Sequence, residues 1–414
     1  MTRGSGEAAM TPRRSGEATT APRRSGATTT APRRRAAVVL GVALLAAWPA
    51  AMPASPAASG SATPPWSAPS APAGPPAPPQ VRTVPRQAVV YRTGAPLVID
   101  GKLEEPAWGA TEWSAPFVDI EGDRRPAPRF ATRVKMLWDA ERFYVAAQLE
   151  EPDVWATIRA RDAVIYQDPD FEVFIDPDGD THEYYELEVN ALGTPWDLFL
   201  VRPYRDGGPA LNGWDIAGLQ VGIDIRGTIN QPGDRDESWT VELALPWTSL
   251  RDASPNHRPP APGDHWRVNF SRVEWQVTAT GTTYVKRRDP ATTRVLPEDN
   301  WVWSPQGAID MHRPEHWGIV QFSNIEAGEG TEAFREDPND RVKAALRELY
   351  ERQRAYRETH GRYAPTLEAI AAYDLRVSGT VFRPVMQATD DLYEIAAPGF
   401  GGATVHIRQD GRVW

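Results

Sequence analysis

Short runs of alternating apolar and polar residues fill the middle of this sequence, and they limit the fold more than any other feature. Successive side chains on a β-strand point to opposite faces, so such runs predict strands with one apolar face. Gly, Pro, Asp and Asn separate the runs, which is typical of a β-sandwich or barrel. We expect strands over 133–139, 142–150, 170–176, 182–192, 196–202, 238–247 and 265–275. The acidic turn PDGD at 177–180 predicts that the third and fourth runs form a hairpin.

The polar faces of these strands carry carboxylate, amide and hydroxyl groups. Tyr184, Glu186 and Asn190 oppose the apolar residues of 182–192, and Glu172 opposes those of 170–176. These groups form either an ordinary solvated outer face of a sheet or a polar floor that lines a ligand cup. The second interpretation gains weight because bulky aromatic residues stand at the ends of the same strands, where binding residues tend to lie.

Tryptophan is unusually abundant, with 16 in the chain. Five follow the apolar phase and are predicted to be structural: Trp108, Trp138, Trp239, Trp247 and Trp266. Five others lie beside Gly, Pro, Asn or Asp at predicted strand ends or loops: Trp196, Trp214, Trp275, Trp301 and Trp303. In NWVWSP at 300–305, Trp301 and Trp303 would share one face of a strand. They either fill a core or offer a flat platform to a ligand such as a sugar ring.

Composition excludes several classes of protein. The sequence contains no cysteine, so disulfides, thiolate metal sites and cysteine nucleophiles are ruled out. Residues 1–35 contain eight arginines and two glutamates, so the rest of the chain is more acidic than the net charge of −10. An acidic body argues against nucleic acid as a partner and suits a neutral ligand or a cation.

The front of the chain is predicted to be a targeting segment. Residues 1–35 form a basic, low-complexity n-region that we expect to be disordered, and 36–58 contain the apolar run and cleavage region of a signal peptide. Residues 59–87 form a Pro/Ala-rich linker. The apolar run is short for a membrane span, so we expect no stable span after cleavage. The protein is therefore expected to be secreted or located in the periplasm or cell envelope, with an uncleaved anchor as the alternative.

One series of phrases resembles a known family. PLVIDGKLEEPAW at 96–108 is similar to the opening of family 9 carbohydrate-binding modules, and FEVFIDPDGD, YYELEVNALGTPWDL, WTVELALPW, WRVNFSRVEW and NWVWSPQG continue the pattern of secreted family-9-like bacterial proteins. The resemblance covers about 95–322 and implies a jelly-roll β-sandwich, here 88–324, that binds sugars and holds calcium. In some members two tryptophans sandwich a terminal sugar, for which Trp196 and Trp303 are the first candidates and Trp214 and Trp301 the next.

The sequence thus predicts an exported, non-catalytic protein whose tryptophans stack on a glycan and whose polar groups bind its hydroxyls. The candidate ligand-binding residues are Trp196, Trp303, Trp214, Trp301, Trp275, Arg272, Asn300, Tyr184, Glu186 and Asn190. Family members usually accompany a glycoside hydrolase, which suggests a role in polysaccharide catabolism. The alternatives are an envelope module that binds other proteins, or a glycoside hydrolase. Motifs of serine hydrolases, zinc proteases and nucleotide-binding enzymes are absent from the sequence.

A cluster of aspartates suggests a cation site. Asp168, Asp170, Asp176, Asp178 and Asp180 lie close together in sequence, and carboxylate oxygens suit calcium. Asp176, Asp178 and Asp180 are the candidate ligands of a structural Ca²⁺. An ordinary Asp-Gly hairpin turn would give the same pattern.

The end of the chain is predicted to be a separate small α+β domain, residues 339–414, after an acidic linker at 325–338. A helix with apolar residues at intervals of three and four should begin near Asn339 and end at Gly361. A second short helix should begin near Thr366, and 391–414 should form a hairpin. The region is similar to the globular part of type IV pilin-like proteins, and its protein partner is unknown.

Overall fold

The computed structural model describes residues 84–372 and 375–414. The predicted n-region, the signal segment and most of the predicted linker therefore lie outside the described residues. Within the described ranges, no helix is both long enough and apolar enough to cross a membrane.

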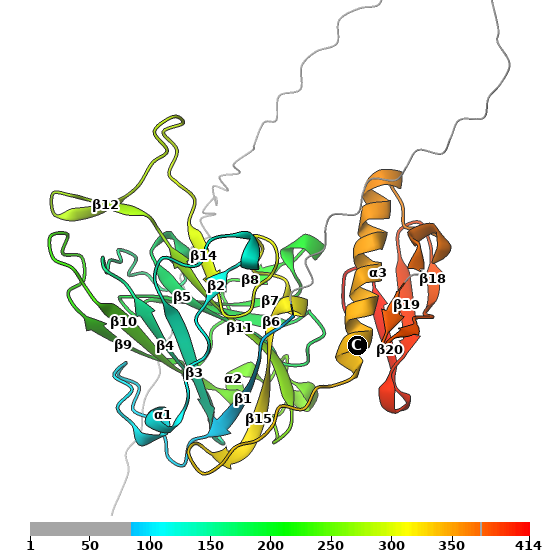
Figure 1. Cartoon of the computed structure of the whole chain (residues 1–414), viewed down its shortest axis with the longest axis horizontal. Helices are drawn as coiled ribbons and strands as arrows, with labels where there is room; N and C mark the ends of the chain where they lie inside the picture. Colours follow the sequence, from blue (N-terminus) through cyan, green and yellow to red (C-terminus); the bar gives the residue numbers. More distant parts are fainter. Residues whose placement is uncertain (1–83, 373–374) are drawn as a thin grey trace, which may run out of the picture. The chain divides into compact units, whose positions relative to one another are not determined.

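Two packed layers of strands make up the larger part of the structure, which is mainly β, as the sequence predicts (Figure 1). The first layer contains β8 (Ala210–Leu211), β7 (Pro195–Leu200), β6 (Tyr184–Asn190), β5 (Asp170–Asp176), β11 (His265–Glu274) and β15 (Gly318–Glu326), with β14 (Asp299–Val302) and β2 (Val118–Asp119) paired beside β11. The second layer contains β3 (Thr132–Trp138), β4 (Arg142–Glu150), β10 (Ser238–Pro246) and β9 (Gln220–Arg226). All seven strands predicted from the sequence are present within about two residues of their expected bounds.

Strand β1 (Gln87–Arg92) joins the two layers. It runs parallel to β15 as far as Val90, and after an irregularity its last two residues pair with β3, also in parallel. The other neighbours along this sheet pair antiparallel. A strand that switches sheets at a bend lets one hydrogen-bonded sheet fold over into a sandwich. The predicted hairpin of β5 and β6 is confirmed.

The main core lies between the layers and is built from the alternating apolar residues of both. Phe171, Val173 and Ile175 of β5 contribute to it from one side, and Val145 and Ala147 of β4 from the other. The five tryptophans predicted to be structural are all buried: Trp108, Trp138, Trp239, Trp247 and Trp266. The short helices α1 (Pro106–Ala110) and α2 (Trp247–Leu250) place two of them.

The phrase IDGKLEEPAW is explained by one buried carboxylate. Glu242 of β10 accepts hydrogen bonds from the backbone N–H groups of Asp100 (3.1 Å) and Gly101 (3.0 Å) and from Nε1 of Trp108 (2.8 Å). Gly101 has a φ of +86°, and a Cβ there would lie 2.5 Å from the backbone of Asp224. Only glycine therefore fits this close approach of the segment to β9 and β10.

The C-terminal part has a core of its own. Helix α3 (Asn339–His360) ends at Gly361, which adopts a left-handed conformation, as the sequence predicts. It packs on a sheet of β18 (Val385–Ala388), β19 (Tyr393–Pro398) and β20 (Thr404–Arg408), with Leu346 and Ile395 among the buried contacts. Two small pairs complete the described strands: β12 (Val277–Thr280) with β13 (Thr283–Lys286), and β16 (Arg376–Val377) with β17 (Thr380–Val381). Where a second helix is predicted, the described residues include a 3₁₀ turn at Glu368–Ile370.

Candidate functional site

A hollow of about 340 Å³ lies on the first layer, over the polar face of β5 and β6 that points away from the main core. Strands β7, β11 and β14 and four loop segments complete it. The lining residues are Tyr166, Glu172, Phe174, Glu186, Glu188, Trp196, Tyr204, Val273, Glu298, Asn300, Met311 and His312. The polar floor of a cup, one of two interpretations of the strand pattern, is therefore present in the structure.

The floor of this hollow follows from strand register. Glu172 of β5 lies directly opposite Glu188 of β6, and Glu188 lies opposite Trp196 of β7. Residues that face each other across adjacent strands project from the same side of the sheet at close range. The two carboxylates and the indole ring therefore stand in one row across three strands.

Three buried carboxylates gather at one end of this floor. Oxygen atoms of Asp170, Glu172 and Glu188 all lie within 4.8 Å of one another. One oxygen of Asp170 accepts a hydrogen bond from the backbone N–H of Val273 (3.2 Å), and Glu188 accepts one from the N–H of Tyr166 (2.9 Å). The other oxygen of Asp170, Oδ2, is buried and has no hydrogen-bond partner among the described residues.

Burial and mutual repulsion raise the pKa values of these acids. Burial raises the pKa of Glu172 to about 7, with Glu298 adding to the effect and a hydrogen bond from Ser271 opposing it. The pKa values of Asp170, Glu186 and Glu188 are raised well above their usual range, first by burial and then by the neighbouring carboxylates. Such groups bind protons or a cation more readily than ordinary surface acids do.

Aromatic side chains form the walls of the hollow. Trp196 is partly exposed, and its Nε1, which is itself buried, has no hydrogen-bond partner among the described residues. Tyr204, 53% exposed, stands at the rim and contacts the ring of His312 (4.5 Å between centroids). Burial, reinforced by the charge of Arg205, lowers the pKa of His312 to about 3, so this imidazole is neutral at pH 7.

Five of the ten candidate ligand-binding residues lie in or directly beneath the hollow. Trp196, Glu186 and Asn300 line it. Tyr184 is fully buried and forms a 2.9 Å hydrogen bond with Nδ1 of His312, so it supports a lining residue. Asn190 is also buried, and its Nδ2 donates to the carbonyl of Ile158 (2.9 Å) and to Asp168 (3.0 Å), which fixes the loop before β5.

The structure corrects the expected exposure of Trp301 and Trp303. They share one face, as predicted, but it is the core face, where they are 3% and 2% exposed. Trp301 lies opposite Arg272, and Arg272 lies opposite the core residue Phe171. The residues that alternate with these tryptophans, Asn300 and Val302, point the other way.

Arg272 and Trp214 pack away from the hollow, whereas Trp275 does not line it but donates a hydrogen bond from Nε1 to the carbonyl of the lining residue Tyr166 (2.9 Å). Arg272 is fully buried and forms salt bridges with Glu151 (2.6 Å) and Glu274 (2.8 Å). The other two are held by their neighbours. The ring of Trp214 packs on Tyr185 at the edge of the main core (4.9 Å), and Trp275 is buried under the ammonium group of Lys286 (3.2 Å to the ring centroid).

Several lining residues come from loops and were not predicted. Tyr166 belongs to a 3₁₀ turn at Ile165–Gln167, Tyr204 to another at Tyr204–Asp206, and His312 to the segment before β15. No periodic pattern marks such positions. The carboxylates Glu172 and Glu188 did carry a signal, because alternation places them on the same polar face as Glu186.

The predicted calcium ligands Asp176, Asp178 and Asp180 do lie together, with oxygens within 4.8 Å. Much of their bonding capacity is already used. Asp176 accepts hydrogen bonds from the N–H groups of Gly179 (2.9 Å) and Thr181 (3.0 Å), and Asp180 forms a 2.6 Å salt bridge with Arg412. These residues fit a bound cation only in competition with that guanidinium group.

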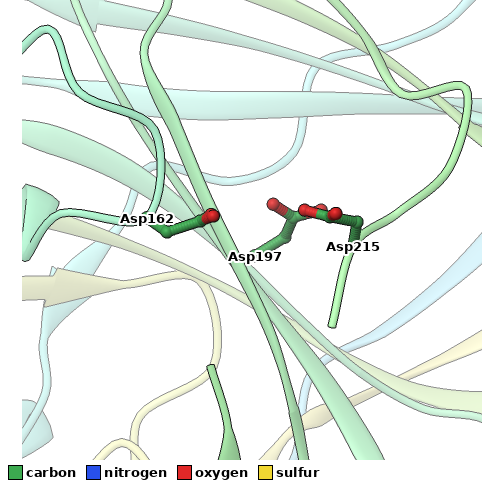
Figure 2. Close-up of side chains that lie close together, drawn as sticks. All are labelled: Asp162, Asp197 and Asp215. Atoms are coloured by element: carbon green, nitrogen blue, oxygen red, sulfur yellow. The ribbon is translucent and has the colours of Figure 1, made fainter. Parts of the chain in front are cut away.

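A third cluster, Asp162, Asp197 and Asp215, has its carboxylates converging on one point (Figure 2). Arg161 supplies the compensating charge there. Its guanidinium group contacts Asp197, and it lies 2.8 Å from Asp215 and 3.6 Å from Asp162. The arrangement is therefore an ion-pair network in which Arg161 offsets part of the negative charge of the three carboxylates.

Residues 99–261 match the sequence model of the family described as carbohydrate family 9 binding domain-like. This part of the sandwich is therefore similar to that family. The matched segment includes the floor of the hollow, with Asp170, Glu172, Glu188 and Trp196, whereas Asn300 and His312 lie beyond it. The similarity of residues 339–414 to pilin-like proteins stays a prediction.

Three solved structures show a distant similarity to this chain. A family 9 carbohydrate-binding module from Caldicellulosiruptor kristjanssonii, in complex with cellotriose, is 15% identical with a TM-score of 0.38, and the match covers 60% of this chain and 100% of that one. The module in complex with glucose is 15% identical with a TM-score of 0.38, and the match covers 61% of this chain and 100% of that one. A Bacteroides uniformis protein described as a candidate carbohydrate-binding protein is 16% identical with a TM-score of 0.42. That match covers 58% of this chain and 100% of the other. No curated protein matches the chain.

Proposed function

We propose that this protein is an exported, non-catalytic carbohydrate-binding protein and that the hollow over β5, β6 and β7 is its sugar site. One observation supports the proposal above the others. A partly exposed tryptophan, Trp196, stands beside two carboxylates within a concave surface whose rim carries Tyr166 and Tyr204. Apolar walls with a few placed polar groups are the usual design of a site for a small polar ligand.

The two parts of the site suit the two parts of a sugar. The C–H face of a pyranose ring would stack on the indole ring of Trp196, which has a large apolar surface. The ring hydroxyls would donate to the carboxylates of Glu172, Glu186 and Glu188, and the amide of Asn300 would donate or accept at the rim.

Binding is favoured over glycoside hydrolysis by the placement of the acids. A hydrolase needs two carboxyl groups that flank the scissile bond, one acting as an acid and the other as a nucleophile or base. Glu172 and Glu188 instead stand side by side on one floor, because they are direct cross-strand partners. Raised pKa values would suit a general acid, but hydrolysis also needs the two carboxyl groups on opposite sides of the scissile bond. Release of reducing ends from any polysaccharide by the purified protein would revive the hydrolase alternative.

Export and a structural calcium ion are parts of this proposal that rest on the sequence. The predicted signal segment supports a location outside the cytoplasm. Asp176, Asp178 and Asp180 would hold the calcium ion, if it displaces Arg412 from Asp180. Removing calcium would then expose the β5–β6 turn without emptying the hollow.

Calorimetric titration with a panel of mono-, oligo- and polysaccharides, including glucose and cellotriose, tests the proposal. Trp196→Ala should weaken binding by about fivefold to thirtyfold, because stacking on a ring is worth on the order of 1–2 kcal/mol. Trp113→Ala is the matched control, since Trp113 is also partly buried and lies outside the hollow. Absence of heat with every saccharide, in calcium and at high protein concentration, would contradict the sugar site.

A further inference from the structure

We propose that Asp170, Glu172 and Glu188 bind a divalent, oxygen-seeking cation such as Ca²⁺, and that a sugar hydroxyl completes the coordination of this ion. The second half of the proposal rests on the sugar site proposed above, whereas the first half stands without it. The site is distinct from the Asp176 cluster at the β5–β6 turn.

The geometry of the three carboxylates suits such an ion. Calcium binds carboxylate oxygens at about 2.3–2.6 Å, so oxygens on one ion lie within about 5 Å of each other. Oxygens of Asp170, Glu172 and Glu188 lie within 4.8 Å of one another, and all three residues are buried. The donor set is made of oxygens alone, which favours Ca²⁺ over the metals that prefer nitrogen or sulfur ligands.

A second observation points to a missing ligand. Asp170 is fully buried, and its Oδ2 has no hydrogen-bond partner among the residues that the structure describes. A buried carboxylate oxygen without a partner is costly, because the charge has lost water and gained nothing in return. A cation between Asp170 and its two neighbours would supply that partner.

The protein offers no internal cation to this cluster within the described ranges. The buried guanidinium group of Arg272, on the neighbouring strand β11, forms salt bridges with Glu151 and Glu274 on the other face of the sheet. The ammonium group of Lys286 sits over the ring of Trp275 and donates to Gln167 (3.4 Å). The other two carboxylate clusters each contact an arginine, which is the difference that singles out this one.

The position of the cluster connects the ion to the ligand. Glu172 and Glu188 both line the hollow, so an ion between them would face it and keep coordination positions open to water or to a sugar hydroxyl. Trp196 is the next residue in the same row, opposite Glu188. A sugar could therefore stack on the indole ring and coordinate the ion at the same time.

Calcium titration of the full-length, chelator-treated protein tests the first half. The calorimetric stoichiometry should be one Ca²⁺ lower per chain in Glu188→Gln than in wild type. Glu172→Gln should show the same decrease. Asp215→Asn is the matched control, because this carboxylate already forms a salt bridge with Arg161 and lies outside the proposed site. In chelator, Glu188→Gln should unfold at a temperature equal to or above that of wild type, because an uncompensated buried charge is gone. Loss of stability in both conditions, or an unchanged calcium count, would overturn the site.

Sugar titration with and without chelator tests the second half, using a saccharide that wild type binds in calcium. Affinity should fall at least tenfold in chelator and be restored by calcium, while Glu188→Gln should bind weakly in both. Equal affinity with and without calcium would overturn the bridging role and leave the sugar site intact. If no saccharide binds but the calcium count still falls in Glu188→Gln, the sugar site fails and the metal site stands.

Discussion

The indole ring of Trp303 packs against the backbone of Gly318, where a Cβ would lie only 2.1 Å from the ring. Gly318 begins β15, and Trp303 follows β14, so this contact closes the core between two neighbours of β11. Gly318→Ala should therefore destabilise the protein by about 1–3 kcal/mol, because an overpacked core must shift the ring or the strand. Gly213→Ala is the control, since its added methyl group would meet no atom within 4 Å. Equal unfolding midpoints in urea for both variants would contradict this packing.

Trp303→Ala tests the same core from the other side. Loss of this buried indole should cost about 3–5 kcal/mol of the free energy of unfolding, the usual range for deleting a buried aromatic side chain. The folded fraction should bind ligand with unchanged affinity, because the ring points away from the hollow. Thermal unfolding followed by titration at low temperature separates the two effects. Weaker binding at full stability would instead place Trp303 at the ligand.

The two tryptophans also show what alternation can and cannot predict. Alternation correctly put Trp301 and Trp303 on one face, and it correctly put Glu172 and Glu186 on the face opposite Phe171 and Tyr185. It could not decide which face β14 turns to the core, because that depends on pairing with β11, about thirty residues earlier in sequence.

The residues that form the walls of the hollow could not be predicted from the sequence, for a different reason. Tyr166, Tyr204 and His312 come from three irregular segments that only the tertiary fold brings together. Arg272 shows a related limit. Alternation along 265–275 places it on the same face as the core residues Trp266 and Phe270. A charged side chain is not expected in a core, so its burial could not be predicted without knowing that Glu151 and Glu274 are buried beside it.

Arg272 should be essential for stability and irrelevant to ligand contact. Its guanidinium group joins two buried carboxylates, Glu151 and Glu274, and burial together with their mutual repulsion raises the pKa of Glu151. Arg272→Met should cost about 3–5 kcal/mol, because removal of one partner leaves buried charge uncompensated. Adding Glu151→Gln to that variant should recover part of the loss. Denaturant unfolding of the single and double variants provides the measurement, and simple additivity would argue against the network.

Glu242 should be the anchor of the segment at 99–108. Glu242→Ala leaves three donors without an acceptor, the N–H groups of Asp100 and Gly101 and Nε1 of Trp108, so we expect a loss of about 3 kcal/mol or more. Tryptophan fluorescence and proteolysis at this segment should report its release before global unfolding. Glu237→Ala, at an exposed carboxylate near the start of the same strand, should be close to neutral. Equal sensitivity of the two variants would contradict the anchoring role.

His312 should make the stability of the protein depend on pH in the acid range. Burial lowers the pKa of its imidazole from 6.5 to about 3, so between these values the unfolded chain binds a proton that the folded chain does not. The stability due to the neutral ring is thus complete above pH 6.5 and is lost as the pH falls, by up to about 1.4 kcal/mol per pH unit. The carboxylates of the hollow have raised pKa values and act in the opposite direction, so total stability is a poor readout.

The difference between wild type and His312→Gln isolates this effect. Glutamine can keep a hydrogen bond to the hydroxyl of Tyr184 but cannot take up a proton. Between pH 7 and pH 4.5 the difference in unfolding free energy should shift by about 2–3 kcal/mol in favour of the variant. His360→Gln, at an exposed histidine on the last turn of α3, controls for loss of an imidazole in general. A constant difference across this range would mean that His312 takes up its proton at the same pH in the folded and unfolded chains, so that its pKa is not lowered by folding.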